Sequence, residues 1–75
     1  MAQHTYSDHV EQRIRQAPDG LGRKLGRIAL KRGYTVLWLS AQLGAARVTV
    51  YRWLAGHPVS NAYRGVVEDF IAQHR

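Results

Sequence analysis

The residues best suited to chemistry lie between positions 47 and 52, where cationic and hydroxyl side chains stand among valines. Arg47 and Arg52 each carry a guanidinium that can donate two parallel hydrogen bonds to O6 and N7 of guanine. Thr49 and Tyr51 carry hydroxyls that suit phosphate oxygens, and Val48 can pack against a thymine methyl group. This set of side chains is typical of a surface that contacts duplex DNA.

A helix over residues 47–54 would bring these side chains to one side of an element. With Val50 at the centre of the buried side and a step of about 100° per residue, Val48 and Arg52 lie nearly opposite it. Arg47 falls in the first turn, at the end of the helix that comes closest to a groove floor. The buried side is then expected to consist of Val50, Trp53 and Leu54.

The spacing of apolar residues predicts four more helices around this one. Val10 and Ile14 stand four positions apart and indicate a short helix over residues 7–16, which Ser7 or Asp8 can cap. The other predicted helices cover residues 21–32, 36–43 and a last segment that begins after Ser60. No segment alternates as a strand does. We therefore expect a compact all-α fold of five helices.

The sequence Ala17-Pro18-Asp19-Gly20 favours a turn and divides the chain. Residues 1–19 are expected to form a short N-terminal helix and turn, and residues 20–75 the DNA-binding domain. A chain of 75 residues builds only a marginal core without disulfides, metal or a partner, and this sequence has no cysteine. We therefore expect stability to gain from dimerisation or from DNA.

Positive charge dominates the middle of the chain. The formal net charge is +6, and no acidic residue occurs from position 20 to position 67. That span holds eight cations, namely Arg23, Lys24, Arg27, Lys31, Arg32, Arg47, Arg52 and Arg64. A basic domain attracts polyanions such as DNA, and the affinity falls steeply with salt.

Several function classes find no support in the sequence. It offers no nucleophile paired with a base and no glycine-rich phosphate loop, so we expect no enzyme activity and no cofactor. The four histidines lack ligand partners at metal-binding spacing, so no metal site is expected. The longest apolar run, Val36 to Leu39, is too short to span a membrane, and the first residues do not resemble a signal peptide. A cytoplasmic protein without a small-molecule ligand is the expectation.

The stretch from about Gly20 to Gln73 resembles the lambda-repressor-like helix-turn-helix family, the family of Cro and the phage repressors. The resemblance is carried by Thr35, Leu39, Ser40, Leu43-Gly44, Arg47, Thr49-Val50, Trp53 and Gly56. It implies that the first helix braces against the DNA backbone while the second enters the major groove. The base-reading residues it implies are Arg47, Val48, Tyr51 and Arg52. The residues expected at the DNA backbone are Thr35, Val36, Thr49 and His57.

Two departures from the family pattern stand out. Ala46 occupies the position where a serine or threonine usually caps the second helix. Leu37 and Trp38 point away from the core side of the first helix, which marks them as a possible protein interface. We expect the ring of Trp38 to be covered by the N-terminal helix, through Tyr6, Val10 and Ile14 of the same chain or of a neighbour.

The resemblance implies a sequence-specific transcriptional regulator, a Cro-like phage or prophage repressor that binds a double-stranded operator as a homodimer. Two alternatives stay open at this stage. One is a winged-helix excisionase or architectural DNA-binding factor, against which stands the absence of strand patterns after Gly56. The other is an antitoxin-type protein-interaction module that uses Leu37 and Trp38.

Overall fold

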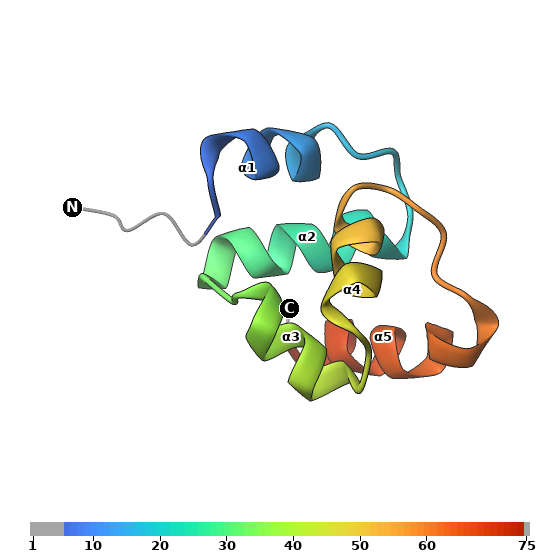
Figure 1. Cartoon of the computed structure of the whole chain (residues 1–75). Coiled ribbons are helices and arrows are strands. Elements are labelled where there is room, and N and C mark those ends of the chain that lie inside the picture. The colour runs from blue at the N-terminus through green and yellow to red at the C-terminus, as the bar shows by residue number, and fades with distance from the viewer. Residues whose placement is uncertain (1–5, 75) are drawn as a thin grey trace.

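The computed structural model describes residues 6–74, and the secondary structure of this part is entirely helical (Figure 1). Its five helices are α1 (Asp8–Arg15), α2 (Leu21–Arg32), α3 (Val36–Leu43), α4 (Arg47–Leu54) and α5 (Asn61–His74). The described residues contain no strand. The predicted all-α fold with five helices is confirmed, and the helix boundaries agree closely with those expected from the sequence.

Local signals in the sequence set the helix ends. The hydroxyl of Ser7 accepts a hydrogen bond from the Val10 amide at the start of α1, and Thr35 accepts one from the Trp38 amide at the start of α3. Gly33 and Gly44 end α2 and α3 with φ values of 72° and 66°. Side chains with a Cβ rarely adopt this left-handed conformation, so glycine at these two positions gives sharp stops.

Helix α2 lies at the centre of the fold. It packs against α1, α4 and α5, while α3 packs against α4 and α5 (Figure 1). Five side chains from four helices are almost completely buried between them, namely Leu25, Leu39, Val50, Leu54 and Val67. These contacts form one apolar core, in which the described residues bury no polar or charged side chain. The side chains of the interior are therefore held mainly by apolar packing.

Helix α1 belongs to that core. Ile14 is buried next to Gly26 of α2, where an added Cβ would lie 2.6 Å from Ile14 Cγ2. Arg23 Nη1 donates hydrogen bonds to the carbonyl oxygens of Arg15, at 2.7 Å, and of Ala17, at 2.6 Å. The proposed division at residue 20 stays a prediction, but the described residues on both sides of it share one core.

The expected cover of Trp38 by α1 of the same chain is wrong. The Trp38 ring stacks on Tyr34 with centroids 4.3 Å apart, and it meets the edges of Phe70 and His74 from α5. Trp38 stays 37 % exposed. The interaction was missed because two partners of Trp38, Phe70 and His74, come from α5, far away in the sequence, and Tyr34 lies in the α2–α3 turn. Ile14 instead packs toward α2 and α4.

The helices of the described part are short compared with the thickness of a bilayer. The longest helix of the described part, α5, has 14 residues and carries Arg64, Glu68 and Asp69. A helix that crosses a bilayer requires about 20 predominantly apolar residues. No helix within residues 6–74 is long and apolar enough to do so.

The tight contact between α2 and α4 gives a testable prediction. A Cβ on Gly22 would overlap the carbonyl oxygen of Trp53, which belongs to the backbone and cannot swing aside. Gly22→Ala is expected to lower the free energy of unfolding by about 1–3 kcal/mol, because overpacking forces the helices apart. Thermal unfolding followed by circular dichroism measures this change.

Gly65 supplies the matched control. It lies within α5, and an added Cβ would meet nothing within 4 Å. Gly65→Ala is expected to raise the free energy of unfolding by up to about 1 kcal/mol, since alanine favours the helix over glycine. Equal effects of the two substitutions would contradict the close packing of α2 on α4.

Candidate nucleic-acid interface

Helix α4 has one side in the core and one side in solvent. Val50, Trp53 and Leu54 are buried, as the helical phase predicted. On the opposite side Val48 is 62 % exposed and Tyr51 47 % exposed. Arg47 and Arg52 are exposed as well. The structure thus brings the four predicted base-reading residues to the outer side of one helix.

The inner side of α4 is fixed from two directions. Gly22 of α2 lets the backbone of α4 approach at Trp53. From α5, the ring of Tyr63 meets the Trp53 ring edge-on, with centroids 5.3 Å apart, and its hydroxyl lies 3.5 Å from the Gly44 carbonyl oxygen. The turn between α3 and α4 buries Ala45, whose amide donates to the Ser40 carbonyl oxygen at 3.1 Å. These contacts determine which side of α4 faces outward.

The outer arginines have no protein partner within the described chain. Neither Arg47 nor Arg52 forms an ion pair or a side-chain hydrogen bond with any of residues 6–74. The acidic residues of the whole sequence are Asp8, Glu11, Asp19, Glu68 and Asp69, none of which belongs to α3 or α4. Unpaired guanidinium groups on an exposed helix are available to an anionic ligand.

The residues predicted at the DNA backbone occupy different environments. Thr35 is exposed at the start of α3, although its hydroxyl already accepts the capping hydrogen bond. His57 is exposed in the loop after α4, and Thr49 is half-buried. Thr35 lines one shallow groove together with Arg47 and Tyr51. The structure therefore places part of the predicted set in one groove.

Val36 requires a correction. Its side chain is only 4 % exposed and belongs to the core, so it is not available for the DNA contact expected of it. The phase of α3 explains the burial, since Leu39 and Leu43 lie on the same side and are buried too. What Val36 can still offer is its backbone amide, in the first turn of α3.

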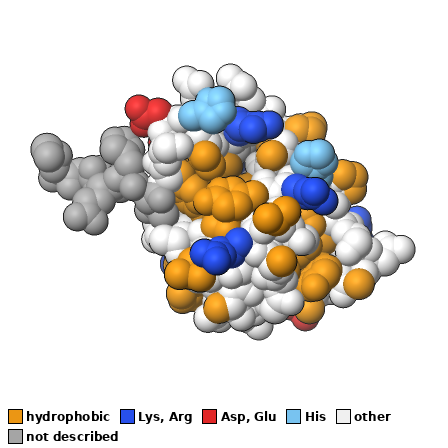
Figure 2. Space-filling model, in the orientation of Figure 1, with side chains coloured by type: hydrophobic (Ala, Val, Ile, Leu, Met, Phe, Trp, Pro, Cys, Tyr) orange, Lys and Arg blue, Asp and Glu red, His pale blue; other side chains and the backbone are white. Residues whose placement is uncertain are grey.

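Helix α1 lies beside α4 and contributes residues that were not predicted for the interface. Tyr6 and Val10 line the groove that also contains Tyr51, and Arg13 lines a second pocket beside α4. Figure 2 shows Lys and Arg side chains set around a central apolar surface on this face. The sequence signal for α1 was the spacing of Val10 and Ile14, which indicated a packed helix but not its neighbour.

Tyr6 joins the start of α1 to the α2–α3 turn. Its hydroxyl donates a hydrogen bond to the Tyr34 carbonyl oxygen at 2.6 Å. Burial raises the pKa of Tyr6 from 10.0 to about 12, and the nearby Tyr51 hydroxyl adds to this rise because two phenolates would repel each other. Tyr6 is therefore a neutral donor that holds α1 next to the outer side of α4.

The histidine and acidic side chains of the described residues are not gathered into a metal-binding group. Within residues 6–74, no group of three or more histidine, cysteine or acidic side chains is arranged to hold a metal ion. His74 packs on Phe70 with ring centroids 4.0 Å apart, and His57 stands in a loop. His4 lies outside the described residues.

Comparisons of this chain with protein-family models, with curated proteins and with solved structures find no match. What the exposed side of α4 binds must therefore be inferred from its own side chains and their surroundings.

The start of α4 offers a test of local stability. Ala46 occupies the N-cap position with extended backbone angles and makes no capping hydrogen bond, as predicted. Ala46→Ser is expected to raise the free energy of unfolding by about 1 kcal/mol, because the hydroxyl can accept a hydrogen bond from an unpaired amide of the first turn. Chemical unfolding measures it. Thr35→Ala, which removes the cap of α3, should shift the stability in the opposite direction, and a loss of stability in Ala46→Ser would contradict this account.

Tyr6 predicts a pH dependence. Its pKa is 10.0 when exposed and about 12 in the folded protein, so its contribution is complete below pH 10 and is lost as the pH rises through 12. At pH 12, where Tyr6 is half ionised in the folded protein, the loss is about 2 kcal/mol. Urea unfolding of the wild type and of Tyr6→Phe between pH 9 and pH 12 isolates the effect, since all other groups titrate in both proteins. The same decline in both would refute the assignment.

Proposed function

We propose that this protein is a sequence-specific double-stranded DNA-binding transcriptional regulator that reads the major groove with α4. Its fold would be that of the lambda-repressor-like helix-turn-helix family, with α3 as the bracing helix and α4 as the reading helix. A Cro-like phage or prophage repressor is the form of regulator that this resemblance implies.

One observation carries the proposal. Helix α4 is firmly seated in the core on one side, and on the other it presents Arg47, Val48, Tyr51 and Arg52 to solvent. The two guanidinium groups have no ion-pair partner among residues 6–74. Val48, which lies between Arg47 and Arg52 in the sequence, is exposed and does not belong to the core. A rigid helix with this mixture of donors and apolar surface suits a groove lined by base edges.

Each residue of α4 has a proposed role. Arg47 and Arg52 donate to guanine O6 and N7, and Val48 packs against a thymine methyl group. Tyr51 reaches a base edge or a neighbouring phosphate. Thr49 contacts the DNA backbone, which fixes the register without reading sequence.

The remaining contacts are proposed for the backbone of the DNA. Thr35 and the amide of Val36 lie at the start of α3, and His57 lies beyond the end of α4. Helix ends and loop side chains are common phosphate ligands. Two copies of the protein would bind an operator with half-sites about one helical turn apart, and repression would follow from occlusion of the promoter.

Selection of bound fragments from random duplex DNA tests the function directly. A DNA reader yields an enriched motif, and dimeric binding makes that motif a repeat of two half-sites with fixed spacing. Fragments without a common motif would reject sequence-specific recognition. The spacing also reports the geometry of the dimer.

The excisionase alternative is weakened by the structure, whereas the protein-interaction module keeps one observation in its favour. A winged-helix excisionase requires a strand hairpin after Gly56, but within the described chain residues 57–60 lead directly into α5 without a strand. A protein-interaction module retains Leu37, which is 63 % exposed on α3. Trp38, the neighbour of Leu37 in the candidate protein interface, lines neither groove of the α4 face. If the DNA reading is correct, Arg52→Ala should weaken DNA binding and Trp38→Ala should leave it unchanged, whereas the reverse result would support the interaction module.

Arg52 gives the sharpest prediction for base recognition. Arg52→Ala is expected to weaken binding to the selected operator by about 5- to 150-fold, because a bidentate guanine contact contributes about 1–3 kcal/mol of discrimination. At one base pair of the motif, the variant should then bind operators with any of the four bases at similar affinity. Fluorescence anisotropy with the operator and its single-site variants measures both effects.

Lys24→Gln is the matched control, since it removes one positive charge from the groove between α2 and α5, which shares no residue with the α4 face. It should leave base preference intact at every position. A uniform loss in both variants would show that charge alone, and not recognition, underlies binding.

A further inference from the structure

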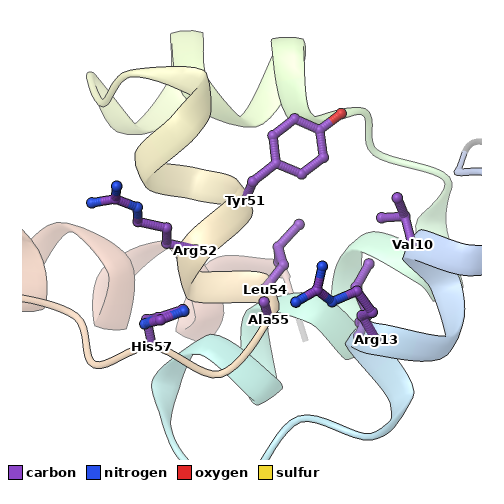
Figure 3. A pocket seen from close by; sticks show the side chains of 8 residues that line it. Val10, Arg13, Tyr51, Arg52, Leu54, Ala55 and His57 are labelled. Atoms are coloured by element: carbon purple, nitrogen blue, oxygen red, sulfur yellow. The ribbon is translucent and has the colours of Figure 1, made fainter.

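A pocket of about 300 Å³ lies between α1 and α4, beside the proposed reading surface (Figure 3). Val10, Leu54 and Ala55 give it an apolar floor. Four cationic or hydrogen-bonding side chains from three separate elements also line it, and they are Arg13 of α1, Tyr51 and Arg52 of α4, and His57 of the loop that follows. No acidic residue lines it.

The polar groups of this pocket are arranged for a ligand rather than for each other. In Figure 3, Arg13 and His57 point toward one another from opposite sides of Ala55, while Arg52 projects sideways from α4, away from Arg13. Within residues 6–74, neither Arg13 nor His57 forms an ion pair or a side-chain hydrogen bond. Two unpaired donors facing one apolar patch would suit a group that is anionic at one end and apolar at the other.

We infer that this pocket binds a phosphodiester of the DNA backbone, with the deoxyribose against the apolar floor and the phosphate between Arg13 and His57. The inference rests on the proposed function, because Arg52 and Tyr51 belong both to the pocket and to the reading surface. The pocket adjoins the outer side of α4, so a DNA strand that borders the groove holding α4 would pass beside it. Helix α1 thereby acts as a third DNA-contacting helix, beside α3 and α4, and positions α4 by binding the flanking backbone.

The groove on the other side of α1 provides the control. It is lined by Arg15, Arg23, Arg27 and Lys31, and it shares only Ile14 with the pocket. Arg27 is exposed and carries the same charge as Arg13. A ligand attracted by net charge alone would respond equally to the loss of either arginine, whereas a phosphate seated in the pocket responds to Arg13.

The test compares Arg13→Gln, Arg13→Lys and Arg27→Gln with the wild type. Fluorescence anisotropy is recorded on the selected operator and on a scrambled duplex of equal length, between about 50 and about 200 mM salt. Loss of one phosphate contact lowers the slope of log K against log salt by about 0.9, so the deficit of Arg13→Gln should shrink about threefold over this range. The change should be equal on both duplexes, and Arg13→Lys and Arg27→Gln should keep the wild-type slope.

Phosphate ethylation interference locates the contact. A phosphate flanking the α4 site whose ethylation weakens the wild type should no longer interfere with Arg13→Gln. Equal changes of slope in Arg13→Gln and Arg27→Gln would overturn the pocket assignment, and so would a loss of affinity for the operator alone. In either case, operator binding by the wild type would still support the proposed function. A wild type that binds neither duplex would overturn both.

Discussion

The close contact between α2 and α4 is the constraint on which the rest of the structure depends. Gly22 has no side chain, so the backbone of α4 rests directly on α2 at Trp53. This contact, with Tyr63 packed on the Trp53 ring from α5, fixes the rotation of α4 about its axis. A helix whose rotation is fixed presents the same side chains to every ligand. Preorganisation of this kind lowers the entropic cost of binding.

The fixed rotation separates the tasks of the α4 residues. The inner side chains contribute burial, and the outer ones contribute unpaired charge and exposed apolar surface. Arg47 and Arg52 gain nothing from intramolecular ion pairs, because the acids of the chain lie on α1, α5 and the α1–α2 connection. A surface of one charge sign destabilises the free protein slightly and attracts a polyanion. In our account, DNA is the polyanion.

Much of the fold could be predicted because its determinants are local. Ser7 and Thr35 cap helices, Gly33 and Gly44 end them, and Val50 marks the inner side of α4. Each of these assignments needs only neighbours within one or two helical turns. The exposed set on α4 followed from the same periodicity, so the candidate site could be located before the fold was known.

Two features depend on tertiary packing and could not be predicted from the sequence, namely the partners of Trp38 and the location of Arg13. Trp38 stacks on Tyr34 and meets Phe70 and His74, so its partners come from the α2–α3 turn and from α5. Helical periodicity predicts on which side of α3 Trp38 lies, but it does not predict which helix packs against that side. The location of Arg13 beside α4 is a case of the same kind, since it depends on how α1 crosses α2.

Amide chemical-shift mapping by NMR with the selected operator duplex tests the central claim most directly. The account predicts that the largest shifts occur at the outer residues of α4, from Arg47 to Arg52, with a second group at Arg13 and His57 across the adjacent pocket. Shifts confined to Leu37, Trp38 and the adjoining side of α5, or the absence of shifts at saturating duplex, would contradict it.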